Sequence, residues 1–286
     1  MSDSSANATP TQLLLVDCPD RRGLIHQITG LLAGVGANIV TNAEFVDRDT
    51  GRFFMRTEFA GGESVAALVE ELRTALPSPA NVRVGSAGCR RVVVLASVEH
   101  HCLGELLLRH AHDELGANIL AVVSNHTLLE TLTTRFNVPF HHVPHADVSR
   151  SEHERAIETV LAAYAPEYLV LAKYMRVLTP DFVSRYPQRM INIHHSFLPA
   201  FVGANPYRQA FERGVKIIGA TAHFVTAQLD EGPIIAQAVV PVDHRYRPEE
   251  MAQAGRDVEK IVLAKALKFV FEERVFLNGS RTIVFD

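Results

Sequence analysis

The apolar run at residues 92–97, VVVLAS, is the feature that most constrains the fold. A short run rich in β-branched residues is typical of a central strand in a parallel sheet that is covered on both faces. Further strand-like runs alternate with helical patterns along the chain, at 117–124, 140–143, 168–171 and around Asn192. The helical pattern at 151–164 opens with Ser151 and Glu154, which have the spacing of a capping box. This alternation predicts a doubly wound, mostly parallel, Rossmann-like α/β domain.

The first part of the chain has a different order of elements. Strand-like runs and helical patterns follow one another as strand, helix, strand, strand, helix, strand, at 12–16, 24–35, 38–46, 53–59, 63–76 and 81–84. This βαββαβ order predicts a ferredoxin-like domain. We therefore expect a disordered lead-in at 1–10, a first domain at 11–85, a small-residue linker at 86–90 and a second domain at 91–286.

Composition excludes several classes of function. The net charge is -4, and basic pairs such as Arg21–Arg22 and Arg90–Arg91 are too short for a nucleic-acid surface. No apolar run approaches the roughly 20 residues that cross a bilayer, and the polar N-terminus has no signal pattern. Cys18, Cys89 and Cys102 are widely spaced and form no disulfide framework. We expect a cytoplasmic protein that binds neither nucleic acid nor membrane.

Three polar residues in the stretch 191–237 carry the expected chemistry. Asn192 and His194 are one residue apart in a strand, so alternation places both side chains on one face. A second strand, predicted at 221–225, leads into a loop that holds Asp230. An amide and an imidazole can stabilise an oxyanion, and a carboxylate can orient water and move protons. We therefore predict a catalytic trio of Asn192, His194 and Asp230 that acts on an acyl or formyl carbon.

Adjacent histidines do not predict a metal site. In a strand, the side chains of His194 and His195 would point to opposite faces, which makes them a poor ligand pair. The same reasoning applies to the pairs His100–His101 and His141–His142. We therefore predict no metal and treat these histidines as structural residues or as supports for the catalytic groups.

The Asn-x-His motif at Asn192–His194 and the segment HFV…D-x-G ending at Gly232 resemble the folate-dependent formyltransferase family. The resemblance implies that Asn192, His194 and Asp230 are catalytic. It also implies that the folate is held by the loop after the strand at 168–171 and by the segment before Asp230, namely by Met175, Arg176, Val177, Leu178 and Leu229. In this family 10-formyltetrahydrofolate is the substrate, and no cofactor is expected.

Differences within the family favour a hydrolase. Residues 97–104, SVEHHCLG, stand where the glycinamide ribonucleotide transferases have a glycine-rich phosphate loop, and they contain one glycine and an acid. No basic extension of the kind used to bind tRNA is recognised after the catalytic part. The resemblance therefore implies hydrolysis of 10-formyltetrahydrofolate to formate and tetrahydrofolate, which would supply formate for purine synthesis and balance one-carbon pools. A transferase acting on a small amine and a non-catalytic folate or amino-acid sensor remain as alternatives.

The first domain resembles the ACT regulatory domains in its βαββαβ order and in the helix end at 34–38. The resemblance implies an amino-acid effector, glycine or methionine, bound near Asp17, Gly23 and Asn38 between paired copies, and hence a homo-oligomer. Each of these residues also has a purely structural interpretation, since Asp17 could cap a turn and Asn38 could supply a turn conformation.

Overall fold

The computed structural model describes residues 11–62, 65–86, 88–199 and 206–286. The predicted lead-in at 1–10 lies outside these residues. The chain divides into two compact units between Gly88 and Cys89, with Phe285–Asp286 grouped with the first unit. The predicted linker at 86–90 overlaps this division. The connection is shorter than predicted, because Ser86 ends one strand and Arg90 begins the next.

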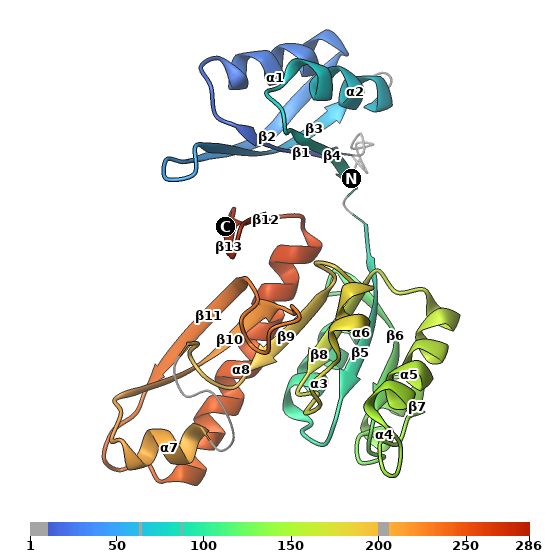
Figure 1. Cartoon of the computed structure of the whole chain (residues 1–286), viewed down its shortest axis with the longest axis vertical. Coiled ribbons are helices and arrows are strands. Elements are labelled where there is room, and N and C mark those ends of the chain that lie inside the picture. Colours follow the sequence, from blue (N-terminus) through green and yellow to red (C-terminus); the bar gives the residue numbers. More distant parts are fainter. Residues whose placement is uncertain (1–10, 63–64, 87, 200–205) are drawn as a thin grey trace, which may run out of the picture. The chain divides into compact units, whose positions relative to one another are not determined.

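The first unit is a four-stranded antiparallel sheet with two helices on one face (Figure 1). Its elements follow the predicted βαββαβ order: β1 (Thr11–Pro19), α1 (Leu24–Gly34), β2 (Ala37–Asp47), β3 (Arg52–Gly61), α2 (Val65–Ala75) and β4 (Asn81–Ser86). The strand order is β2-β3-β1-β4. Alternate residues of β1 meet the apolar stripes of both helices in one core, which includes Leu14, Val16, Ile28, Leu32, Leu68 and Leu72.

Strand β1 is longer than the sequence pattern predicts. The prediction ended it at Val16, whereas it continues through Pro19. The reason is that Asp17 is paired on both sides, with Phe54 of β3 and Asn81 of β4. Its carboxylate forms an ion pair with Arg52 of β3. Pairing with neighbouring strands therefore overrides the turn-forming tendency of the residues that follow.

The second unit contains a seven-stranded sheet of order β11-β10-β9-β8-β5-β6-β7. The five strands from β9 to β7 are parallel, and β10 runs antiparallel to both of its neighbours, β9 and β11. The elements are β5 (Arg90–Ala96), α3 (His101–Ala111), β6 (Ala117–Ser124), α4 (Glu130–Thr134), β7 (Phe140–His142), α5 (Arg150–Tyr164), β8 (Tyr168–Ala172), α6 (Pro180–Ser184), β9 (Met190–His194), α7 (Pro206–Glu212), β10 (Ile217–Phe224), β11 (Ile234–Pro241), α8 (Pro248–Phe271), β12 (Val275–Asn278) and β13 (Arg281–Val284). The mostly parallel, doubly wound sheet was predicted, whereas its edge strand β11 and the strand β12 were not.

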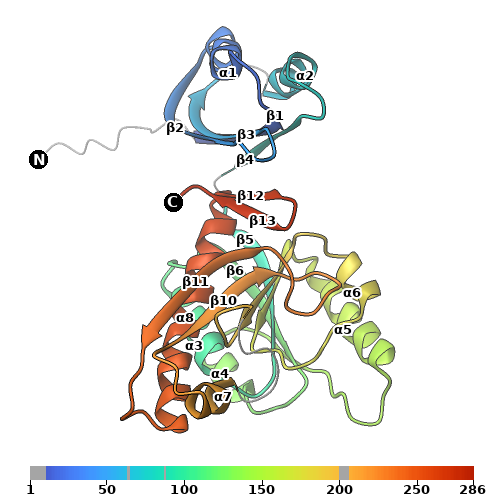
Figure 2. The same ribbon diagram turned by 60° about the vertical axis from the view of Figure 1, so that its left-hand side comes forward.

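The central strand β5 is buried on both faces, as its composition predicts. Val92 and Val94 face a core that contains residues of α3 and α8. Val93 and Leu95 face a second core that contains residues of α5 and α6. Figure 2 shows α3 and α8 on one side of this sheet and α5 and α6 on the other. The chain moves from β5 to β6 and β7 and then crosses to β8 and β9, so the direction of winding changes between β5 and β8. Ligands bind at such a point, beyond the carboxyl ends of the strands.

The capping box of α5 lies two residues before the predicted position. The hydroxyl of Ser149 accepts a hydrogen bond from Glu152 N, and the Glu152 carboxylate accepts one from Ser149 N. The prediction of Ser151 and Glu154 was wrong because the sequence repeats the Ser-x-x-Glu spacing at both places. Glu154 is instead buried on the inner face of the helix, where it has a different partner.

None of the helices within the described part of the chain is long and apolar enough to span a membrane.

Candidate active site

Strand β9 places Asn192 and His194 on one face of the sheet. The adjacent strand β10 runs antiparallel to it, with Asn192 directly opposite His223 and His194 opposite Thr221. Residues that lie opposite one another on paired strands have neighbouring side chains. Accordingly, Nδ2 of Asn192 lies 3.2 Å from Nε2 of His223. The other ring nitrogen of His223 donates to the carbonyl of Phe224 at 2.9 Å, so Nε2 of the neutral ring accepts from the amide.

The loop between β10 and β11 brings Asp230 back over this face. Its two ends are joined, since Phe224 N donates to Pro233 O at 2.9 Å. A Cβ on Gly232 would stand 1.7 Å from the carbonyl oxygen of Phe224, so this close approach requires glycine. Asp230 itself has a φ of 57°, a left-handed conformation that Asp tolerates better than most residues. Together these features aim the carboxylate of Asp230 at β9 and β10.

The three predicted catalytic residues converge. Oδ2 of Asp230 lies 3.3 Å from Nδ1 of His194, and Oδ1 lies 3.7 Å from Nε2 of His223. Because Asn192 contacts the same nitrogen of His223, the carboxylate and the amide meet around one imidazole. Within the described residues, the buried Nε2 of His194 has no hydrogen-bond partner. A buried polar atom without a partner is uncommon, and a substrate oxygen would satisfy it.

The carboxylate of Asp230 is held in its ionised form. Burial by itself raises the pKa of this carboxyl group. The hydrogen bond and charge of His194, with a contribution from the nearby His223, outweigh burial and hold the pKa well below its usual range. The same pairing stabilises a positive charge on His194 during a reaction. A carboxylate with so low a pKa is a weak proton acceptor. It is therefore better suited to orient a water molecule and pass on its proton at once than to remain protonated.

A cavity of about 460 Å³ opens beside these groups. All five residues predicted to hold the folate line it, together with the three predicted catalytic residues. Met175, Val177 and Leu229 are exposed apolar side chains, a common lining for the binding site of a flat aromatic ligand. The sequence-based grouping of the loop at 175–178 with Leu229 therefore agrees with the geometry of the cavity.

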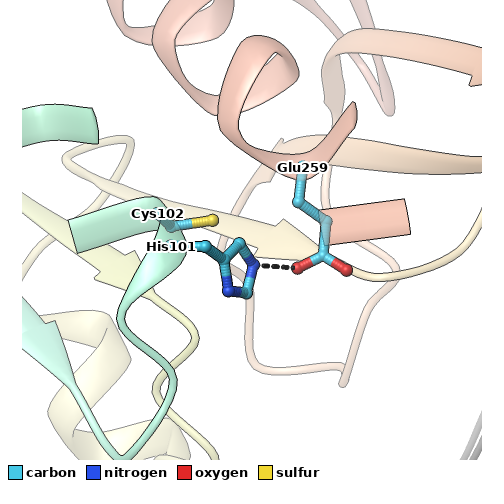
Figure 3. Close-up of side chains that lie close together, drawn as sticks. All are labelled: His101, Cys102 and Glu259. Atoms are coloured by element: carbon cyan, nitrogen blue, oxygen red, sulfur yellow. Dashed lines mark hydrogen bonds and ion pairs between the residues drawn. The ribbon is translucent and has the colours of Figure 1, made fainter. Parts of the chain in front are cut away.

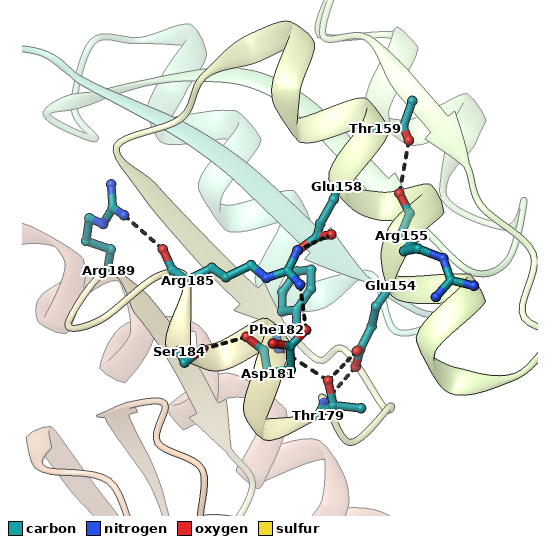
Figure 4. A network of polar contacts seen from close by, with 10 residues as sticks. All are labelled: Glu154, Arg155, Glu158, Thr159, Thr179, Asp181, Phe182, Ser184, Arg185 and Arg189. Atoms are coloured by element: carbon teal, nitrogen blue, oxygen red, sulfur yellow. Dashed lines mark hydrogen bonds and ion pairs between the residues drawn. The ribbon is translucent and has the colours of Figure 1, made fainter.

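Hydrogen bonds support both ends of the loop at 173–178. At its start, Met175 N donates to the hydroxyl of Ser97, which donates to Asn125 Oδ1 at 2.8 Å. At its end, the backbone N–H of Thr179 donates to the buried carboxylate of Glu154 at 2.7 Å, and the Thr179 hydroxyl donates to the same carboxylate. Figure 4 shows Glu154 of α5 reaching Thr179 at the start of α6. One cavity wall is thus tied to the ends of β5 and β6 and to α5.

A second group of buried polar side chains lies next to the catalytic trio. The carboxylate of Glu259, on α8, lies 2.8 Å from Nε2 of His101 (Figure 3) and 3.2 Å from the ammonium of Lys173. Tyr207 donates to its other oxygen at 2.6 Å. The pKa of Glu259 is lowered to about 2, because the bonds to His101 and Tyr207 and the charge of Lys173 outweigh burial, which raises it. Glu259 thereby joins α3, α7, α8 and the loop after β8.

His101, Cys102 and Glu259 have the composition of a metal-binding group, with ligand atoms within 4.8 Å of one another. One observation favours an ion-pair cluster over a metal site: the ammonium of Lys173 already supplies a positive charge beside Glu259. Burial, with a further contribution from Glu259, raises the pKa of the Cys102 thiol far above its ordinary value.

The predicted separation of His194 and His195 is wrong. Their rings stack, with centroids 4.9 Å apart and an angle of 24° between the planes. Strand β9 ends at His194, so the alternation of side chains no longer applies to His195. His100 and His101 likewise lie at the start of α3 instead of in a strand. His141 and His142 do lie in β7, where His141 bonds the hydroxyl of Tyr164 at 2.7 Å.

The residues predicted to bind an effector do not converge within one chain. Gly23 precedes α1 with a φ of 87°, close in sequence to Asp17 at the end of β1. Asn38 is exposed near the start of β2 and pairs with Ala60 of β3. Asp17 pairs with Phe54 of β3, whose partner on β2 is Phe45. Asn38 and Asp17 therefore lie at opposite ends of the sheet. An effector site that uses both would need a second copy of the domain.

Sequence reasoning missed the roles of Lys173, His195, Glu259 and Tyr207. Lys173 could have been found, since it directly follows the end of a parallel strand, as Asn125 does. Glu259 falls in a long amphipathic helix, where a single acid reads as part of a solvated face. Its burial follows from packing between α8 and the sheet.

Comparison with known proteins agrees with this architecture. The formyl transferase family model matches residues 90–267, and the ACT domain model matches residues 12–76. A formyltetrahydrofolate deformylase of Escherichia coli is 54% identical over 96% of this chain and 98% of its own length. The crystal structure of a formyltetrahydrofolate deformylase from Pseudomonas syringae superposes with a TM-score of 0.93 at 38% identity, covering 99% of this chain and 96% of that one.

A glycinamide ribonucleotide transformylase from Symbiobacterium toebii is less similar. It has a TM-score of 0.67 and 32% identity, and although 98% of that protein is covered, the match spans 72% of this chain. The deformylases, by contrast, match across both units. The chain therefore belongs to the formyl transferase family, and within it to the formyltetrahydrofolate deformylases, enzymes in which an ACT domain precedes the catalytic domain.

Proposed function

We propose that this chain hydrolyses 10-formyltetrahydrofolate to formate and tetrahydrofolate. The observation that carries the proposal is the contact of Asp230 with His194 in the cavity that Asn192 also lines. The match to deformylases over nearly the whole chain supports hydrolysis more than transfer to a second substrate. The loop at 175–178 and Leu229 hold the folate, and the reaction uses no cofactor and no metal.

The geometry supports a direct attack by water on the formyl carbon. Asn192 and the unpartnered Nε2 of His194 donate hydrogen bonds to the oxyanion that forms as water adds. Asp230 orients the water and relays its proton to N10 as the bond between the formyl carbon and N10 breaks. Formate leaves in its ionised form and releases the second proton to solvent. The ion pair with Asp230 keeps His194 oriented and stabilises its positive charge throughout.

The test is formate release from 10-formyltetrahydrofolate with no second substrate present. A hydrolase produces formate and tetrahydrofolate in equal amounts under these conditions. A transferase to a small amine would need the amine before it turned over. A sensor that had lost catalysis would bind the folate and release no formate. Formate release that required an added amine would replace the proposal by the first of these alternatives.

We further propose that the ACT domain regulates this hydrolysis through glycine and methionine, so that formate for purine synthesis is released in step with the one-carbon pools of the cytoplasm. The separation of Asp17 from Asn38 within one chain fits a site that forms between two copies. A homo-oligomer is therefore part of the proposal. Titration of the full-length protein with each amino acid, by calorimetry and by formate release, tests it. No heat and no change in rate with either compound would contradict it.

A further inference from the structure

Attack by water requires two hydrogen-bond acceptors. The oxygen must direct a lone pair at the formyl carbon, so both of its O–H groups point away from that carbon and need partners. A carboxylate has about four acceptor positions. The contact with His194 uses one of those of Asp230, whereas the unprotonated Nε2 of His223, 3.7 Å away, donates nothing to it. Asp230 can therefore accept one O–H of the water. The amide nitrogen of Asn192 and a protonated ring nitrogen of His194 are donors, which leaves the second O–H without an assigned acceptor.

His195 is a candidate for this second acceptor. It lines the same cavity as Asn192, His194 and Asp230, and its ring stacks on that of His194. The ring of Tyr207 also lies near His195, with 6.4 Å between the two ring centroids.

The turn that carries His195 is held from β10. The hydroxyl of Thr221 donates to Ser196 O at 2.9 Å and accepts from Leu198 N at 3.0 Å. Gln237 of β11 donates both to this hydroxyl and to Leu198 O. The position of the imidazole is thus set by the sheet.

The surroundings keep this imidazole neutral. Burial and then the charge of Lys173 lower the pKa of His195 to about 4. His194 acts in the same direction, whereas Glu259 and Asp230 act against it. Lys173 is 4% exposed and is fixed by its contact with Glu259. A neutral imidazole has one ring nitrogen that accepts hydrogen bonds, so this ring offers an acceptor at neutral pH.

We propose that His195 orients the attacking water by accepting its second O–H, and that Lys173 is a positioning residue that keeps His195 in the accepting form. The inference rests on the proposed hydrolysis. No bond to His195 forms or breaks: the water oxygen bonds to the formyl carbon, the bond to N10 breaks, and the proton passes through Asp230 to N10.

The first test compares His195→Leu with His195→Gln. Leucine removes the acceptor, and we expect kcat to fall about 100-fold with KM within about threefold, a size typical of a group that handles the protons of the nucleophile. Glutamine keeps an acceptor oxygen, so its kcat should lie between that of wild type and that of His195→Leu. His141→Leu is the matched control, because His141 is a half-buried histidine outside the cavity. Calorimetric unfolding of each variant checks the fold.

The second test uses pH. With Lys173→Met, the pKa of His195 should rise toward its ordinary value of about 6.5. As pH is lowered, kcat should therefore begin to fall at a higher pH in this variant than in wild type. The double variant Lys173→Met with His195→Leu should lose this shift. If wild type releases formate and a folded His195→Leu variant is equally active, the inference is overturned and the proposed hydrolysis stands. A wild type that releases no formate would remove the hydrolysis itself.

Discussion

Nδ1 of His194 lies 3.3 Å from the carboxylate of Asp230, although one residue ends a strand and the other lies in a loop beyond the next strand. The contact exists because β10 runs antiparallel to β9 and its loop folds back over the pair. The pairing leaves Nε2 of His194 available to a substrate oxygen. The loop that carries Asp230 is therefore as much a part of the candidate active site as the strand.

Asp230→Asn should lower kcat about 100-fold, because the amide can neither relay a proton nor stabilise a positive charge on His194. KM should stay within about threefold, since the cavity keeps its lining. Formate release under saturating substrate measures the change. Asp181→Asn is the control, as this carboxylate is exposed on α6 and outside the cavity. A rate for Asp230→Asn within twofold of wild type would remove the assigned role.

Asn192→Ala should lower kcat by about 10²–10³, the usual effect of losing one oxyanion donor. Combining it with His194→Ala should cost much less than the product of the two single effects, because both side chains serve the same oxyanion. A double-mutant cycle on kcat measures the coupling. Strictly multiplicative effects would show that the two residues act independently.

Gly232→Ala should abolish most activity. A Cβ at this position would stand 1.7 Å from the backbone oxygen of Phe224, so the loop has to move and Asp230 moves with it. Gly104→Ala is the matched control in the same unit, since its Cβ would meet Leu132 at an ordinary 4.0 Å and alanine favours a helix by up to about 1 kcal/mol. Formate release measures the activity of both variants, and the unfolding temperature checks that each is folded. Full activity in a folded Gly232→Ala protein would argue against the loop's role.

Glu259→Gln should lower stability at pH 7 by up to about 3–5 kcal/mol, because it removes the nearer counter-charge of the buried ammonium of Lys173 and leaves it only the more exposed carboxylate of Glu99, 3.7 Å away. The folded-state pKa of Glu259, about 2, lies below the ordinary value of 4.5. Its contribution to stability is therefore complete above about pH 4.5 and is lost as pH falls toward 2.

The stability gap between wild type and Glu259→Gln should accordingly be about 2 kcal/mol smaller at pH 3 than at pH 7. The interval from pH 4.5 to pH 3 is 1.5 pH units, and each unit is worth about 1.36 kcal/mol. Scanning calorimetry at pH 7 and pH 3 measures it. Glu212→Gln, an exposed partner of Arg208, should differ little from wild type at either pH. A gap for Glu259→Gln that is the same at both pH values would show that its carboxylate adds no pH-dependent stability.

Thr179→Val should raise KM for the folate several-fold with a smaller effect on kcat. The substitution removes the hydroxyl that caps α6 and bonds Glu154, so that only the backbone N–H of Thr179 still ties this end of the loop at 173–178 to Glu154. Arg185→Ala breaks a nearby but exposed ion pair with Glu158 (Figure 4) and should leave KM unchanged. Steady-state kinetics of both variants separates the two cases. Equal KM values for Thr179→Val and wild type would mean that the loop holds its conformation without this bond.

Local patterns were sufficient to predict both folds and the placement of Asn192 with His194 on one strand. The β-branched run at 92–97 indicated a strand buried on both faces, and the spacing of Asn192 and His194 placed them on one face. These predictions succeeded because they rest on the two-residue period of a strand and on the order of elements, which are properties of adjacent residues. The same period failed at His195, where the strand ends and the rings stack.

Only the tertiary structure decided which distant side chains surround the residues of the candidate site. Glu259 is brought to Lys173 by the packing of α8, and His223 is brought to Asn192 by strand pairing. The return of Asp230 to the face of β9 depends on a loop closed by backbone contacts. The amino-acid sequence determined which elements form, because their periods and end signals are local. The environment of each catalytic group depends on contacts between residues far apart in the chain, which no local pattern records.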